Sequence, residues 1–210
     1  MDTQKSGKTP NLSAEEEHDV TKNQPPRAAV LHEIIRVQGD LELERSIAAL
    51  FWSALAAGLT MGLSLMAMGL LNSRLPSGEA FKVIASFGYC AGFLAVILSR
   101  QQLFTENTLT AVLPIMSKPT LNNFGRLFRL WTVVLVGNLM GTLLVAYAML
   151  HLPIFDNQTD KAFLEIGRKV MENDARQMFS KGIISGWMIA TMVWMIPSME
   201  SAKMWIIILI

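Results

Sequence analysis

The chain has 210 residues and a net charge of +1, and 51% of its residues are hydrophobic. A charge so close to neutral does not suggest a nucleic-acid or acidic partner. The single cysteine, Cys90, excludes an internal disulfide bond. The sequence contains no metal-ligand cluster, nucleophilic triad or phosphate-binding loop, so we expect neither an enzyme nor a protein that needs a cofactor.

The apolar residues are concentrated in long uncharged stretches. The first 46 residues carry 15 of the 35 charges, whereas residues 47–73, 83–99 and 130–150 carry none. A hydrocarbon core about 30 Å thick requires roughly 20 apolar residues of helix, a length that two of these stretches reach. The sequence therefore predicts an integral membrane protein with several transmembrane helices.

The N-terminal part is polar. Residues 1–27 hold few large apolar groups among Ser, Thr, Asn, Pro, Lys and Glu, which predicts a disordered tail. Residues 28–45 mix apolar and charged side chains, which favours an amphipathic helix at the membrane interface, with a simple polar lead-in as the alternative. The first membrane helix is predicted at 46–72, where Gly58 and Gly62 share one face and favour close helix packing.

The second apolar segment is interrupted by polar residues. Residues 83–98 are apolar, the sequence Ser-Arg-Gln-Gln-Leu-Phe-Thr-Glu-Asn follows, and apolar character resumes at 109–116. One helix over 83–116 would measure about 51 Å, too long for a single crossing. One interpretation is a broken membrane helix, with arms at 83–98 and 107–116, whose loop is buried or lines a cavity. The other is a helix that ends at Leu98 and an ordinary surface loop.

A basic loop precedes the third predicted membrane helix. Residues 117–129 hold three basic residues and no acid, which predicts a cytoplasmic loop and hence a cytoplasmic N-terminus. The third helix is predicted at 124–150. Gly137 and Gly141 lie four residues apart in it, and Asn138 either bonds across helices or lines a pathway.

The C-terminal part is predicted to continue this topology. The polar connection at 151–181 should lie outside, with a surface helix over 161–176, and a fourth membrane helix is predicted at 180–199. A further apolar run begins at Met204, and the sequence stops seven residues into it, so we expect the natural chain to continue.

Three segments resemble the formate/nitrite transporter family. The sequence at 102–107, Gln-Leu-Phe-Thr-Glu-Asn, resembles the Leu-Phe-Thr loop of that family's broken second helix. Residues 136–142 resemble its third-helix pattern Gly-Asn-Leu-hydrophobic-Gly, and residues 182–195 resemble its fourth-helix signature. The segments occur in the family's order, and the resemblance extends over about residues 30–210.

The resemblance implies an all-α membrane protein with an aquaporin-like six-helix bundle, built of inverted repeats with broken helices and here truncated in the fifth helix. It implies a homopentamer in a bacterial inner membrane, with its N-terminus in the cytoplasm. Each protomer would carry small monovalent anions such as formate or nitrite, as a channel or a proton-linked transporter. The implied partners are therefore the lipid bilayer, the anion and four further copies, with no nucleic acid.

The resemblance also implies where the anion passes. Leu103 and Phe104 would form apolar walls beside the cytoplasmic constriction, and Thr105 would offer its hydroxyl to the anion. Lys169 corresponds to a lysine that attracts anions near the outer entrance, and the family's central histidine would lie beyond Ile210. The expected substrate-pathway residues are Leu103, Phe104, Thr105, Asn107, Asn138 and Lys169.

This sequence departs from the family pattern around the Leu-Phe-Thr triad. The family has glycine, a small residue and an acid before the triad, where this chain has Arg100, Gln101 and Gln102, and Glu106 stands where a small residue usually follows. Charges inside membranes are rare and suggest function, so Arg100, Gln102 and Glu106 are candidates for selectivity or gating. Arg100 and Glu106 could pair across the loop, or both could lie in water.

These departures leave two other functions open. One is a pore with the same fold for another small solute. The other is a non-transporting membrane scaffold or sensor, in which the polar N-terminal segment would be the working part.

Overall fold

The computed structural model describes residues 13–16, 18, 26–76 and 78–210, so most of the predicted tail at 1–27 lies outside it. In this described part the regular structure is entirely helical. Short 3₁₀ turns occupy Phe87–Tyr89, Ile196–Ser198 and Glu200–Ala202. The α-helices are α2 (Ala28–Glu44), α3 (Ile47–Arg74), α4 (Glu79–Ser86), α5 (Cys90–Leu98), α6 (Phe104–Thr110), α7 (Val112–Ser117), α8 (Leu121–His151), α9 (Asn157–Met171), α10 (Ala175–Met195) and α11 (Lys203–Leu209).

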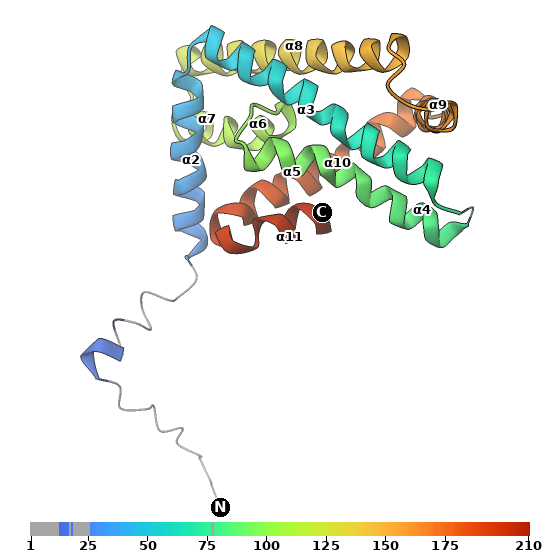
Figure 1. Cartoon of the computed structure of the whole chain (residues 1–210). Coiled ribbons are helices and arrows are strands. Elements are labelled where there is room, and N and C mark those ends of the chain that lie inside the picture. The colour runs from blue at the N-terminus through green and yellow to red at the C-terminus, as the bar shows by residue number, and fades with distance from the viewer. Residues whose placement is uncertain (1–12, 17, 19–25, 77) are drawn as a thin grey trace, which may run out of the picture.

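Four helical segments within the described residues are long and apolar enough to cross a membrane. They are Ile47–Arg74, Glu79–Leu98, Leu121–His151 and Ala175–Ser198. Figure 1 shows α2 lying across one end of the bundle that these segments form, with α9 at the opposite end of α3. The interrupted second segment runs beside α3 as α4 and α5, and after the interruption α6 and α7 return toward α2 (Figure 1).

The helices α3 and α8 pack against each other through glycines on both partners. A Cβ atom on Gly58 would lie 2.3 Å from the carbonyl oxygen of Asn138, and one on Gly141 would lie 2.4 Å from that of Leu55. Small residues permit such close approach where lipid gives helices no hydrophobic drive to associate. The structure confirms that both predicted glycine pairs mark helix packing, and it shows that they pack against each other.

The second membrane segment is not one regular helix. Its residues Phe87–Tyr89 form a 3₁₀ turn between α4 and α5. At this turn, the hydroxyl of Ser64 in α3 donates to the carbonyl of Tyr89 at 2.5 Å and accepts from the amide of Gly92 at 3.0 Å. Ser64 thus supplies polar partners at the bend, where tightening the helix disturbs its own ladder of hydrogen bonds.

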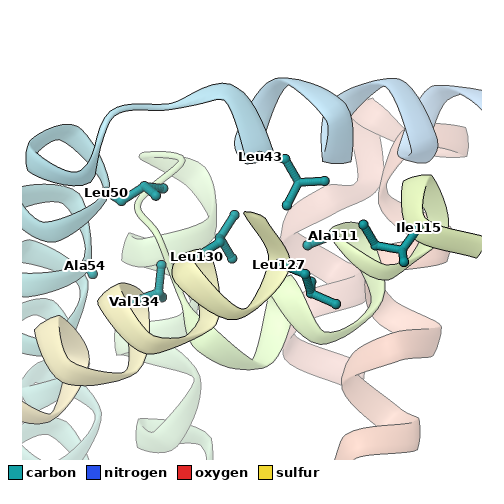
Figure 2. Packing of buried hydrophobic residues seen from close by; sticks show 8 residues of the cluster. All are labelled: Leu43, Leu50, Ala54, Ala111, Ile115, Leu127, Leu130 and Val134. Atoms are coloured by element: carbon teal, nitrogen blue, oxygen red, sulfur yellow. The ribbon is translucent and has the colours of Figure 1, made fainter. Parts of the chain in front are cut away.

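A hydrophobic cluster fills the α2 end of the bundle, beside the interruption. Its buried members come from α2, α3, α8 and the arm formed by α6 and α7, and Figure 2 shows them converging. Phe104 and Trp131 pack against its border. The same cluster therefore holds the arm after the break against α2, α3 and α8. Its members are Leu43, Leu50, Ala54, Ala111, Ile115, Leu127, Leu130 and Val134.

Several helix ends differ from the predicted ranges because capping residues set them. Helix α9 begins four residues before the predicted position, where the Asp156 carboxylate accepts hydrogen bonds from the amides of Gln158 and Thr159. Helix α10 begins at Ala175, because Asp174 and Gln177 form a capping box there. These caps satisfy amides that the first turn of a helix leaves unpaired.

Candidate functional site

The candidate site is the interruption between α5 and α6. Helix α5 ends in a Schellman motif, in which the amide of Gln101 donates to the carbonyl of Val96 at 3.0 Å and that of Arg100 donates to Ile97 at 3.2 Å. This motif requires one residue in the left-handed backbone conformation, and Arg100 adopts that conformation with φ of 53°. Glycine usually occupies this position, because a Cβ atom makes the conformation unfavourable.

Asn138 of α8 holds the chain on both sides of Leu103. Its side-chain amide donates to the carbonyl oxygens of Gln102 at 2.9 Å and Ala54 at 2.8 Å. Its side-chain oxygen accepts from the amide of Phe104 at 2.8 Å. One side chain thus satisfies two backbone groups that no helix can satisfy at the break and ties them to α3 through Ala54, which is the cross-helix role expected of a membrane asparagine.

The polar side chains of the loop are themselves buried. Gln102 and Asn107 are only 6% and 4% exposed. The Asn107 amide donates to the Gln102 side-chain oxygen at 3.0 Å and to the Leu103 carbonyl at 3.1 Å. The backbone amide of Gln102 donates to the Ser53 hydroxyl at 3.1 Å. The alternative of an ordinary surface loop is therefore wrong, and the segment is a buried break between two helical arms.

The Leu-Phe-Thr triad lies at the start of α6. Leu103 is extended and 7% exposed, whereas Phe104 and Thr105 form the first turn of the helix rather than a loop. The Phe104 ring meets Trp131 at a centroid distance of 6.3 Å. Thr105 is exposed, and its hydroxyl has no hydrogen-bond partner within the described chain. The break therefore presents one hydroxyl outward from a rigid, buried support.

The charged candidates do not form the hypothesised pair. Arg100 is exposed and Glu106 is half-buried, and no ion pair joins these two side chains. Pairing fails because Arg100 caps the end of α5, whereas Glu106 already belongs to the first turns of α6.

Lys169 lies apart from the break. It belongs to α9, which packs at the far end of α3 through a 3.0 Å hydrogen bond between the hydroxyls of Ser73 and Thr159. Its electrostatic attraction is to Glu79 at the start of α4. Lys169 is therefore a residue of the opposite face of the bundle and takes no part in the geometry of the loop.

A model of the formate/nitrite transporter family matches residues 29–210. The chain belongs to the formate/nitrite transporter family. It is 53% identical over 185 residues to the inner membrane protein YfdC of Escherichia coli strain K12. That alignment covers 88% of this chain and 60% of YfdC, so the chain spans about three fifths of the length of its curated relative.

The fold is also similar to that of a solved channel. A pentameric formate channel with formate bound superposes with a TM-score of 0.67 and 23% sequence identity, covering 78% of this chain and 66% of the channel. The predicted all-α membrane fold with broken helices is thereby confirmed. The four apolar segments and the similarity to YfdC make this chain a multi-pass protein of a bacterial inner membrane.

Sequence reasoning within this family framework missed two residues of the site. Ser53 accepts a hydrogen bond from the Gln102 amide, and Glu42 accepts one from the Gln102 side chain at 2.8 Å. Ser53 is one small polar residue in a long apolar helix, and Glu42 is one of several acids on an amphipathic helix. No local pattern distinguishes either residue, because each is defined only by a partner about fifty or sixty residues away.

Proposed function

We propose that the break between α5 and α6 forms one constriction of a pathway for small monovalent anions such as formate or nitrite. The observation that carries this proposal is the exposed Thr105 hydroxyl, which has no partner within the described chain and stands on a buried, hydrogen-bonded support. A group that is rigidly held and free to bond can replace part of an ion's hydration shell as it passes.

The physical problem for the anion is desolvation, because hydrocarbon offers no hydrogen-bond donors. Leu103 and Phe104 exclude water from behind the constriction, since Leu103 is buried and Phe104 packs on Trp131. Thr105 then donates to the passing anion. Asn107 and Asn138 serve the pathway indirectly, by holding the chain that presents the hydroxyl.

The family and the solved relative support the choice of substrate class. The family is that of formate/nitrite transporters, and the similar solved structure is a channel with formate bound. Both descriptions name transport rather than catalysis, which supports a transport function for this chain. The proposal covers both a channel and a transporter that moves the anion together with a proton. In either case, we propose that Lys169 adds positive potential at the α9 end of the bundle, which we assign to the outside. That assignment puts α2 and the N-terminus in the cytoplasm.

We further propose that the protein is a homopentamer. The solved relative is pentameric. Large apolar side chains on the outside of the bundle, such as Trp52, Leu143 and Tyr147, are 64–67% exposed and need lipid or a neighbouring subunit to cover them. Mass measurement of the full-length protein in detergent tests this part of the proposal, and a monodisperse monomer would contradict it.

Flux into proteoliposomes that contain the full-length protein tests the pathway. Formate, nitrite, acetate and chloride are compared for the wild type, Thr105→Ala, Thr105→Ser and Thr108→Val. Thr108 is the matched control, because it is exposed on the same helix and its hydroxyl is already bonded to the Thr105 carbonyl at 2.6 Å. Formate or nitrite flux should fall at least about tenfold in Thr105→Ala and recover in Thr105→Ser, whereas Thr108→Val should conduct normally.

Two outcomes would contradict the proposal. Equal flux in Thr105→Ala and the wild type would remove Thr105 from the pathway. The absence of flux for all four anions, in a protein shown to be folded, would turn the assignment toward another small solute or a role without transport.

A further inference from the structure

Helix α2 is docked on the broken element through its buried face. Leu31, Ile35 and Leu43 are at most 8% exposed. A Cβ atom on Gly39 would lie 2.1 Å from the carbonyl oxygen of Thr110, so the backbone of α2 approaches the far arm of the break directly. The structure thus places a helix from before the first membrane span against the arm that follows the break.

The C-terminal end of α2 is anchored as well. The Arg129 guanidinium of α8 donates to the carbonyl oxygens of Leu43 at 2.7 Å and Arg45 at 3.1 Å. These are carbonyls that the last turn of a helix leaves without partners, and a positive charge is favourable there. Helix α2 is therefore anchored to the broken element at Gly39 and to α8 at Leu43.

Glu42 lies between these two anchors and reaches the break itself. Its carboxylate accepts a hydrogen bond of 2.8 Å from the Gln102 side chain, and the Arg45 guanidinium holds it at 3.1 Å. The Gln102 oxygen in turn accepts from the Asn107 side chain at 3.0 Å. A continuous run of hydrogen bonds thus joins α2 to the residue before Leu103 and to the second turn of α6.

Glu42 differs from the other acids of α2, all of which the structure describes. Glu33 and Asp40 pair with Arg36 on the same helix, and Glu44 approaches Arg126 at 3.7 Å. Glu42 alone among them bonds to the loop. Its side chain is only 27% exposed, so water competes little for the hydrogen bond.

We propose that Glu42 is a positioning residue for the anion pathway, which holds Gln102 and thereby fixes the segment Leu103–Thr105. The docking of α2 then determines how rigidly the Thr105 hydroxyl is presented. The effect on flux rests on the function proposed above, whereas the effect on the rigidity of the loop does not, so the experiment measures both.

Hydrogen–deuterium exchange measures the rigidity of the loop directly. In the full-length protein in nanodiscs, a peptide covering residues 99–108 reports the amides of Gln102 and Phe104, which are bonded to Ser53 and Asn138. Glu42→Ala should raise the exchange rate of these amides about tenfold or more, because a hydrogen bond to a charged acceptor is lost. Glu42→Gln keeps an acceptor oxygen and should exchange more slowly than Glu42→Ala. Glu44→Ala is the matched control and should exchange like the wild type.

Swapping the side chains of Glu42 and Gln102 gives a second test, which does not shorten either side chain to alanine. Gln102→Glu places a second carboxylate against Glu42 and should loosen the loop. The double variant Glu42→Gln with Gln102→Glu restores one donor and one acceptor in the reverse order and should recover slow exchange. Anion flux should follow the same order across these variants, with the wild type and the double variant highest.

Three results would overturn the proposal. One is exchange in Glu42→Ala that matches the wild type and Glu44→Ala. Another is a double variant that exchanges as fast as Gln102→Glu alone. The third is normal flux in a Glu42→Ala protein whose loop exchanges rapidly. Absence of flux in the wild type would contradict the proposed function but would leave the exchange results to decide the role of Glu42 in the loop.

Discussion

The side-chain oxygen of Asn138 accepts a hydrogen bond of 2.8 Å from the amide of Phe104, which joins α8 to the first residue after the break. The same side chain donates to Gln102 and Ala54. Asn138→Ala should therefore lower the free energy of unfolding by roughly 2 kcal/mol, since membrane hydrogen bonds contribute about 0.6–1 kcal/mol each. Unfolding of the protein in mixed micelles by SDS measures this change.

Asn123→Ala is the control for that substitution. Asn123 is half-buried on the same helix, and its side chain donates only to the Lys118 carbonyl. Its loss should change the stability by less than about 0.5 kcal/mol. Equal stability losses in the two variants would show that Asn138 does not support the break.

The glycine contacts between α3 and α8 predict a sharp dependence on position. A Cβ atom on Gly58 of α3 would lie 2.3 Å from the Asn138 carbonyl oxygen, whereas one on Gly125 of α8 would meet nothing within 4 Å. Gly58→Ala should destabilise by about 1–3 kcal/mol through overpacking. Gly125→Ala should stabilise by about 0.5–1 kcal/mol, because alanine favours a helix. Thermal unfolding of both variants in detergent measures these changes. Similar shifts of the melting temperature in the two variants would contradict the close approach of α3 and α8.

The left-handed backbone of Arg100 predicts a stabilising substitution. With φ of 53°, Arg100 has a backbone conformation that its Cβ atom makes unfavourable. Arg100→Gly should therefore raise the free energy of unfolding by up to about 1 kcal/mol. Arg100→Ala removes the same charge but keeps the Cβ atom, so its thermal stability should not rise. If Arg100→Ala stabilised as much as Arg100→Gly, the cause would be the charge rather than the backbone.

The cap at the start of α9 predicts a pH dependence. Hydrogen bonds from the amide and hydroxyl of Thr159 hold the pKa of Asp156 below its ordinary value of 3.8, with a contribution from Arg74. A carboxyl whose pKa is lowered by folding stabilises the fold above its ordinary pKa, and this contribution disappears as the pH falls through the lowered value. Asp156→Ala should therefore lower the melting temperature at pH 7, and the difference from the wild type should shrink below about pH 4.

Asp160→Asn provides the comparison for the cap. Asp160 lies in the first turn of α9 and makes no side-chain hydrogen bond within the described chain. Its substitution should leave a smaller difference at pH 7. A gap for Asp156→Ala that stayed constant down to pH 3 would contradict the contribution of the ionised cap.

The sequence was sufficient for those features that depend on one segment and the bilayer. Charge-free stretches predicted the spans, because membrane thickness fixes the length of a crossing helix. The glycine pairs predicted close packing, whereas the polar interruption after Leu98 left a broken membrane helix and a surface loop as alternatives. What the glycines could not specify was their partner, because a small face permits approach by any helix.

Features that depend on distant partners escaped the sequence. Glu42 and Gln102 lie 60 residues apart, and only the folded chain brings their side chains together. Phe104 and Thr105 were expected in the loop because of the resemblance to the family's Leu-Phe-Thr loop, but the N–H of Phe104 bonds to Asn138 and the helix starts at that point. Tertiary contacts, rather than local propensity, thus determine where the second arm begins.

The hydrogen bonds of Asn138 also have a consequence for biosynthesis. Gln102 is synthesised 36 residues before Asn138, whose side chain donates a hydrogen bond to the Gln102 carbonyl. Lipid cannot satisfy the free backbone groups of the break, so the two arms cannot settle among lipids as soon as they are made. We therefore expect the two arms to remain in the insertion machinery or near the membrane surface until α8 is made. On this expectation the third span completes the partners that the second one needs in the bilayer.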